Sequence, residues 1–204
     1  MLLQKSLFYN FQDFNSSQLP SHTDLSLIFS LIKIEQQDLL TLCSTLQNCK
    51  NLKILQLLLD SNEINNEIPL DFGEAFANLT ELTISFYFNE IGPEVASSFA
   101  LSLEKCTKLT YLFIDFTGNS VGSQGLFGLA SGLSALKQLV LNLNFNCVSD
   151  EGILDICTAI QQCNNLWYLE FELMDNNELS QESKLKLKQQ VKKLKRLVFI
   201  ICWI

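Results

Sequence analysis

The side chains that could do chemistry in this chain are few and scattered. The sequence holds one histidine, His22, and its neighbours Ser21, Thr23 and Asp24 carry the other groups of a hydrolytic triad. A triad is a spatial arrangement that a fold assembles, so residues adjacent in sequence do not form one. We therefore interpret His22 as an ordinary loop or capping residue.

Two further stretches resemble sites and have simpler explanations. The stretch TGNSVGSQG, residues 117–125, contains glycines but lacks the lysine of a phosphate-binding loop of the GxxxxGK[ST] kind. Asp150, Glu151 and Asp155 stand at the start of an expected helix, where the helix dipole favours acidic residues. We expect no catalytic residue and no enzymatic activity.

The seven cysteines show neither a CxxC pair nor a cluster with histidine, so they carry no zinc signature. Cys43, Cys49, Cys157 and Cys163 fall on the apolar positions of expected helices. Free cysteine commonly behaves as a small buried apolar residue. We expect reduced thiols, no metal site and no cofactor.

The charge of the chain is asymmetric. Of 14 basic and 22 acidic residues, seven basic ones lie between Lys184 and Arg196, and no acidic residue follows Glu182. Residues 1–183 therefore carry 7 − 22 = −15, and the rest carries +7. An acidic body argues against nucleic-acid binding, which needs a basic face. No apolar run approaches the roughly 18 residues of a membrane span, and no secretory signal is present, so we expect a soluble cytoplasmic protein.

The elements that position these residues repeat along the chain. A leucine leads an alternating apolar triplet seven times, at steps of 30, 27, 30, 27, 30 and 28 residues. Alternation of apolar residues predicts one buried face of a strand. Seven residues after most leads stands an asparagine able to bond the backbone of a turn, whereas the first unit has Ile32 there. The lead leucines are Leu25, Leu55, Leu82, Leu112, Leu139, Leu169 and Leu197, and the asparagines are Asn62, Asn89, Asn119, Asn146 and Asn176.

Between the strands the apolar period becomes helical. Residues 93–109 place Val95, Phe99 and Leu103 on one stripe, and residues 149–166 repeat the pattern. The intervening helices are weaker, because DFGEAFANL is brief and SQGLFGLASGL contains three glycines. We expect these two to be partly 3₁₀ or irregular.

The pattern LxxLxLxLxxNx(I/L/V) followed by a helix resembles a leucine-rich repeat of the ribonuclease-inhibitor-like type, in a long-unit variant similar to ciliate repeat families. The resemblance covers about residues 22–204. It implies an α/β solenoid, a curved horseshoe segment with a parallel sheet on the concave face and helices on the convex face. We expect residues 1–21 to form a cap, residues 22–204 to form about seven strand–helix units, and the last strand to span residues 196–203.

Residues between the buried positions of each strand should face the concave side, where such solenoids usually bind partners. Aromatic and acidic side chains gather there, which would suit a basic or amphipathic segment of a protein partner. The expected partner-binding residues of this face are Tyr87, Tyr111, Phe113, Asp115, Tyr168, Glu170 and Glu172.

The chain ends in RLVFIICWI, an apolar strand with no charge after Arg196. An unprotected edge strand invites pairing with another chain. We expect Arg196, Val198, Ile200 and Trp203 to meet a partner or a continuation of the chain.

The favoured function is a non-enzymatic interaction module or scaffold subunit of an intracellular assembly, with a cytoskeletal or ciliary assembly as one setting. Two alternatives stay open. A regulator that activates a small GTPase would need a polar loop aimed at nucleotide, and the chain's only arginine is Arg196. A substrate-recruiting arm of a ubiquitin ligase would need an adaptor-binding helical motif near the N-terminus, for which residues 1–21 look short.

Overall fold

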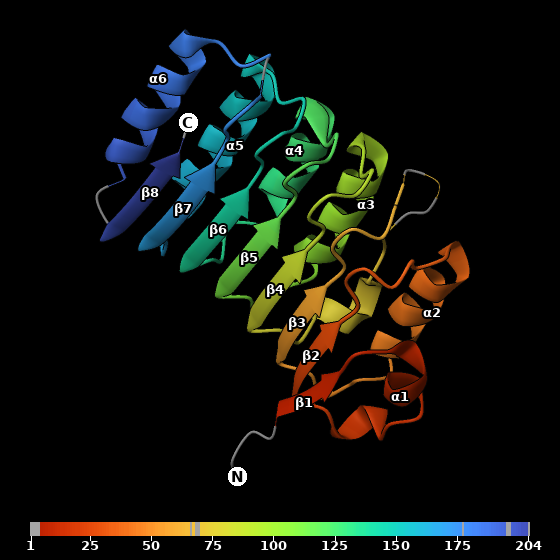
Figure 1. The fold of residues 1–204 in the computed structure, drawn as a ribbon. Coiled ribbons are helices and arrows are strands. Elements are labelled where there is room, and N and C mark those ends of the chain that lie inside the picture. The colour runs from red at the N-terminus through yellow and green to blue at the C-terminus, as the bar shows by residue number, and fades with distance from the viewer. Residues whose placement is uncertain (1–4, 66, 68–69, 177, 195–196, 204) are drawn as a thin grey trace.

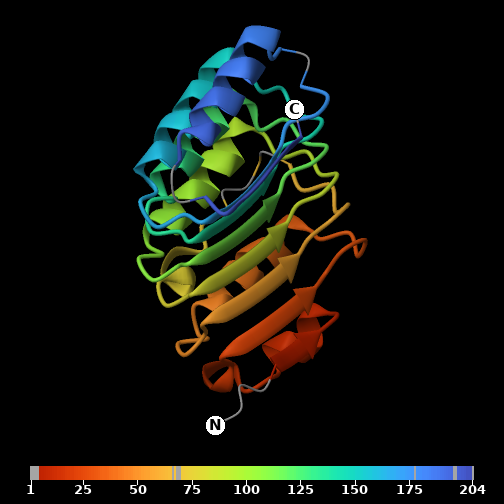
Figure 2. The same ribbon diagram turned by 90° about the vertical axis from the view of Figure 1, so that its left-hand side faces the viewer.

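In the computed structural model, the described residues form a single sheet of eight parallel strands that lines one side of a curved array, and the helices cover the other side (Figure 1). The structure describes residues 5–65, 67, 70–176, 178–194 and 197–203. The strands follow chain order across the sheet, so each coil lies beside the coils before and after it. Seen from the side, the helices form one layer against the sheet (Figure 2). The predicted α/β solenoid is confirmed.

The strands are β1 (Lys5–Phe8), β2 (Asp24–Ile28), β3 (Ile54–Leu58), β4 (Glu81–Ser85), β5 (Tyr111–Asp115), β6 (Gln138–Asn142), β7 (Tyr168–Glu172) and β8 (Phe199–Trp203). The helices are α1 (Phe11–Asn15), α2 (Gln36–Leu46), α3 (Pro93–Glu104), α4 (Gly122–Ser131), α5 (Asp150–Gln162) and α6 (Gln181–Lys192). Two 3₁₀ turns, η1 (Leu19–Ser21) and η2 (Gly73–Phe76), complete the list.

The strand register follows the predicted repeat. Leu82 stands opposite Leu112, and Leu112 stands opposite Leu139. Leu112, Ile114 and Phe116 are at most 1% exposed, as the alternating pattern requires. Each coil therefore buries its apolar triplet against its neighbours, and the intervening side chains face the concave side.

A column of buried asparagines ties each coil to the coil before it. The Asn119 side-chain amide donates to the carbonyl of Phe86, one coil earlier, and to that of Phe116 in its own coil. Its carbonyl oxygen accepts from the backbone N–H of Ile91. The first unit has no asparagine at the column position, and there Asn62 Oδ1 accepts from the Ile32 N–H at 3.1 Å. The same backward bond is made by Asn62, Asn89, Asn146 and Asn176 to the carbonyls of Phe29, Leu59, Phe116 and Leu143.

The two weaker helices behave differently from each other. The brief segment forms the 3₁₀ turn η2, as expected. The glycine-containing segment forms a regular α-helix, α4, so the expectation of an irregular element is wrong there. Gly125, Gly128 and Gly132, spaced at three and four residues, lie against α3. A Cβ on Gly125 would stand 2.8 Å from the Ala96 Cβ, so these glycines serve close helix packing.

Residues 5–21 form an additional coil at the start of the array. They supply β1, which pairs in parallel with β2 and extends the sheet by one strand. They also supply the five-residue helix α1, whose first turn is held by the Asn10 side chain accepting from the Asp13 N–H at 2.8 Å.

His22 fastens this N-terminal coil, in keeping with its interpretation as a capping residue. Ser17 Oγ donates to the Phe14 carbonyl at 2.6 Å, so it must accept from His22 Nε2–H, 2.8 Å away. Nδ1 is then the acceptor for Ser6 Oγ at 2.9 Å. The imidazole is 7% exposed and packs edge-on against Phe8. Burial lowers the pKa of His22 below its ordinary value.

The last strand differs from expectation in start and register. β8 begins at Phe199 rather than at residue 196, and Ile200, not Leu197, stands opposite Leu169. Leu197 instead packs partly buried against the core before the strand. It therefore matches Leu166, three residues before Leu169. RLVFIICWI is apolar at almost every position, so its alternation does not specify a register.

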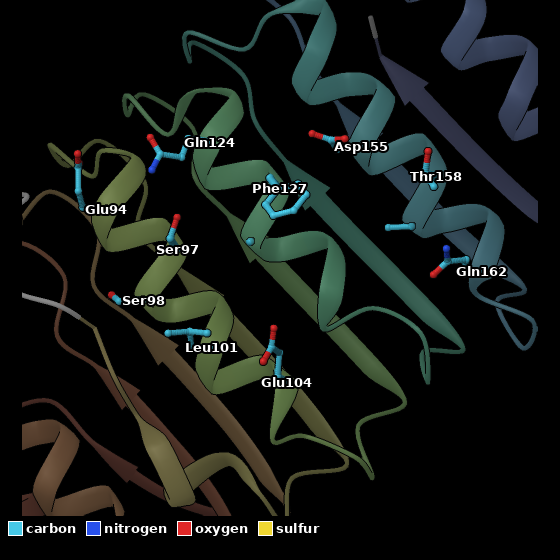
Figure 3. A pocket seen from close by; sticks show the side chains of 12 residues that line it. Glu94, Ser97, Ser98, Leu101, Glu104, Gln124, Phe127, Asp155, Thr158 and Gln162 are labelled. Atoms are coloured by element: carbon cyan, nitrogen blue, oxygen red, sulfur yellow. The ribbon is translucent and has the colours of Figure 1, made fainter.

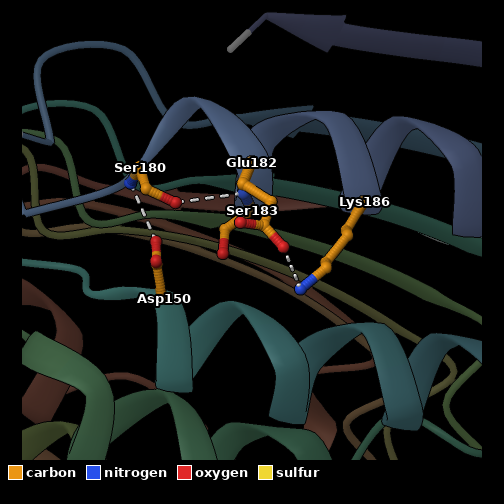
Figure 4. Close-up of polar contacts among 5 residues, drawn as sticks. All are labelled: Asp150, Ser180, Glu182, Ser183 and Lys186. Atoms are coloured by element: carbon orange, nitrogen blue, oxygen red, sulfur yellow. Dashed lines mark hydrogen bonds and ion pairs between the residues drawn. The ribbon is translucent and has the colours of Figure 1, made fainter.

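Helix α6 is attached to α5 at its first turn (Figure 4). The backbone N–H of Ser180 donates to Asp150 at 2.8 Å, and the Ser180 hydroxyl accepts from the N–H of Ser183. Lys186 forms an ion pair with Glu182 at 2.8 Å on the exposed side. The hydrogen bonds from Ser180 lower the pKa of Asp150. None of the described helices is long and apolar enough to cross a membrane.

Candidate functional site

The concave face carries a hollow of about 390 Å³ over β5, β6 and β7. It lies over three rows of paired residues, in which all side chains but that of Asp115 line the hollow. The outer strands lie about 10 Å apart, two strand spacings. Their larger side chains form walls, and the smaller β6 side chains form the floor. The rows are Tyr111–Gln138–Tyr168, Phe113–Val140–Glu170 and Asp115–Asn142–Glu172.

The structure brings together five of the seven residues predicted for this face. Tyr87 is 42% exposed on the loop after β4, and Asp115 ends β5; neither lines the hollow. Sequence reasoning did not assign Gln138, Val140 or Asn142 to the site, because their types carry no signal. Their importance is that they are small enough to leave space. The five predicted residues that line the hollow are Tyr111, Phe113, Tyr168, Glu170 and Glu172.

Hydrogen bonds fix the acidic wall of the hollow. The Tyr168 hydroxyl donates to Glu170 at 2.8 Å, and this bond raises the pKa of the Tyr168 phenol. Asn144 Nδ2 donates to Glu172 at 2.6 Å, while its Oδ1 accepts from the Met174 N–H. Both carboxylates therefore keep defined positions beside the aromatic rings, where they would face a cationic ligand group.

A second acidic pair lies next to the hollow. Burial raises the pKa of Asp115, although its carboxylate accepts from the Thr117 N–H at 2.8 Å, and nearby Asp60 adds to the rise. Asp60 in turn accepts from the Ser85 hydroxyl and from the Tyr87 N–H at 3.2 Å. The concave face is thus acidic beyond the hollow itself.

The loops after the strands hold a feature that the sequence did not reveal. The residue before each Asn position has a positive φ, a conformation that favours glycine. Only one of the six is a glycine, and Leu31, Phe88 and Phe145 are 79%, 53% and 53% exposed. Bulky exposed side chains thus mark the rim of the concave face at every second coil. The six residues are Leu31, Ser61, Phe88, Gly118, Phe145 and Asp175.

The structure describes only some of the residues predicted for the C-terminal edge. Val198 and Trp203 are 69% and 58% exposed, and Trp203 stands opposite Glu172 at the concave edge. Ile200 of β8 stands opposite Leu169 of β7. Arg196 lies outside the described residues.

The six cysteines whose side chains the structure describes are free thiols. Five are buried, and burial raises the pKa of Cys43 and Cys106 to about 12 and of Cys49 and Cys163 to about 11. Cys147 is exposed. Within the described part of the chain, no group of three or more His, Cys, Asp and Glu residues could hold a metal ion.

A second, larger hollow of about 700 Å³ lies on the convex face, where α4 runs between α3 and α5 (Figure 3). Phe127 of α4 projects into it at 69% exposure, and Leu101 of α3 is 59% exposed beside it. Sequence reasoning missed this site. The glycines at positions 125, 128 and 132 were its signal, because a helix face without side chains lets α4 approach α3 closely.

Comparison with known proteins gives a likeness of fold. The chain matches no family model and no curated protein. Among solved structures it is similar to leiomodin-1 actin-binding site 2, with 19% identity and a TM-score of 0.50 over 84% of this chain and 81% of that one. Together with the observed coils, this likeness supports a leucine-rich-repeat-like fold.

Proposed function

We propose that this chain is a non-enzymatic protein-interaction module that binds a basic or amphipathic segment of a partner on its concave face. The observation that carries the proposal is the hollow over β5–β7, which combines aromatic walls with two held carboxylates. Aromatic rings supply large contact areas at low entropic cost, and they anchor many interfaces.

The size of the hollow limits the partner. Its 390 Å³ and its width of two strand spacings, about 10 Å, fit a few side chains of one helix or loop. A lysine or arginine side chain would place its aliphatic part against Tyr111 or Phe113 and its charge near Glu170. Such a cation beside an aromatic ring gains further from the ring's negative face.

For the setting, we propose a cytoplasmic, cytoskeletal assembly. Leiomodin-1 actin-binding site 2, which shares the fold, is by its name an actin-binding element. Actin is therefore the first defined partner to test. The paired units of 57 residues support the finer assignment to the ribonuclease-inhibitor-like class, and a ciliary setting remains a hypothesis.

The two alternative functions gain no support from the described residues. An activator of a small GTPase would need a polar loop directed at nucleotide, and no arginine lies in a repeat loop, since the single arginine of the chain is Arg196. A ligase arm would need a helical adaptor motif, whereas the N-terminal segment forms β1 and the five-residue α1.

The test is affinity capture with the purified chain, using a native extract and, separately, purified actin. The concave variant carries Tyr111→Ala, Phe113→Ala and Glu170→Lys. A matched convex variant carries Leu101→Ala and Phe127→Ala, which also removes two exposed apolar groups. We expect the concave variant to bind a defined partner with an affinity at least about 30-fold lower, the loss typical of central anchors of an interface. The convex variant should keep its affinity for that partner.

Circular dichroism and the unfolding midpoint must show that both variants remain folded. A partner captured equally by the wild type and the folded concave variant would refute the concave site. A wild-type chain that captures another partner through the concave face but does not bind actin would refute only the proposed cytoskeletal setting.

A further inference from the structure

The hollow on the convex face is a groove above α4, and its lining is apolar and acidic. Leu101 and Phe127 give it an apolar floor, and Glu94, Glu104 and Asp155 stand along its walls. Among the described residues that line it, none is basic. Exposed apolar groups of this size, bordered by charge of one sign, are typical of interaction surfaces.

The depth of the groove is built into the helix packing. Gly128 and Gly132 bring α4 against α3, where a Cβ on Gly132 would stand 2.6 Å from the Leu103 Cβ. Gly152 lets the start of α5 approach α4 closely, because a Cβ there would stand 2.8 Å from Ser123 Cα. Small residues, including Ser97 and Ala159, line the walls, so a docked helix can approach closely.

Helix α6 has the opposite character. Leu185, Lys188 and Lys192, at spacings of three and four residues, share one exposed face of the helix. Leu185 is 57% exposed. This α6 ridge is about 10 Å long, because seven residues separate its ends. The ridge is shorter than the groove wall between Glu94 and Glu104, about 15 Å by the same rise per residue.

We propose that the groove above α4 receives the α6 ridge of a second copy of this chain. Leu185 would cover Phe127 and Leu101, and the lysines would face the wall carboxylates. Within one copy the contact cannot form, since α5 lies between α4 and α6. A two-fold axis parallel to α5 places α6 of each copy over α4 of the other. One symmetric dimer therefore forms the groove–ridge contact twice. Symmetric dimers of this kind are the commonest oligomers.

The test measures the mass of the full chain by sedimentation equilibrium across the micromolar range. We expect a reversible dimer. Phe127→Glu places a carboxylate on the floor of an acidic groove and should weaken the dimer at least about 30-fold, the loss typical of a central anchor. The matched control, Phe145→Glu, changes another exposed phenylalanine on the concave rim and should leave the dimer intact.

Charge exchange then tests the pairing itself. A groove variant with Glu104→Lys and Asp155→Lys should be monomeric, and so should a ridge variant with Lys188→Glu and Lys192→Glu. Combining the four substitutions restores opposite charges, so the combined variant should form dimers again. The altered side chains line the open groove or the exposed ridge, and circular dichroism checks that each variant is folded.

A wild-type chain that stays monomeric would overturn the proposal, and the groove would then be open to a basic helix of another protein. A dimer that survives Phe127→Glu, or that the combined variant does not restore, would place the contact elsewhere.

Discussion

The side-chain amide of Asn119 donates to the backbone carbonyl of Phe86 at 2.8 Å, joining residues 33 positions apart in neighbouring coils. The same side chain accepts from the Ile91 N–H at 2.8 Å and is 7% exposed. One buried side chain therefore satisfies backbone groups of two coils where the chain leaves the sheet.

Replacing Asn119 with leucine should lower the free energy of unfolding by about 2 to 4 kcal/mol, because the Ile91 N–H and the Phe86 carbonyl would remain buried without partners. Urea unfolding followed by circular dichroism measures this loss. The exposed Asn78 is the control, and Asn78→Leu should change stability by no more than about 0.5 kcal/mol. Equal effects at the two sites would show that the asparagine column adds little.

Substitutions at two positive-φ positions should change the stability of the fold in opposite directions. Gly118→Ala should destabilise by about 1 to 2 kcal/mol, since its φ is +70° and the new Cβ would stand 3.1 Å from the Phe88 ring. Asp175→Gly, at φ +57°, should stabilise by up to about 1 kcal/mol. Thermal unfolding of the two variants beside the wild type checks both signs, and a stabilising Gly118→Ala would contradict the conformational argument.

His22 should make stability depend on pH. The unfolded chain takes up a proton near the ordinary pKa of 6.5, whereas burial lowers the pKa of the folded state. Between these values the unfolded state binds more protons, so the contribution of His22 is complete above about pH 7 and declines as the pH falls toward 5.

The His22→Gln variant tests this pH dependence. It should be less stable at neutral pH, and its unfolding midpoint should decline less steeply than that of the wild type over the same pH range. Parallel pH profiles for the two proteins would exclude His22 as the group responsible.

Cysteine labelling should separate the exposed thiol from the buried ones. In the native chain at mildly alkaline pH, iodoacetamide should modify Cys147 well before Cys43 or Cys106, because those two are buried and their pKa is raised to about 12. Site-resolved mass spectrometry measures the order. Denatured chain provides the control, in which the sites should react alike; early labelling of Cys43 in the native chain would contradict the structure.

Much of the concave site could be predicted from the sequence, because alternation along β5 and β7 assigns Tyr111, Phe113 and Tyr168 to the face opposite the core. What alternation does not provide is the hollow. It arises because Val140 and its neighbours on β6 are smaller than the side chains on either side, a relation between three strands that are 27 and 30 residues apart.

The sequence by itself determined the solenoid, its strands β2 to β7 and its asparagine column. Each coil buries its apolar residues only against adjacent coils, so the constraint recurs with a fixed period that can be read along the chain. Tertiary structure decided the register of β8, where a uniformly apolar segment has no alternation to choose between Leu197 and Ile200 as the partner of Leu169. Tertiary structure also decided the groove above α4. The depth of this groove depends on how closely Gly125 and Gly132 approach α3, and packing between coils sets that distance.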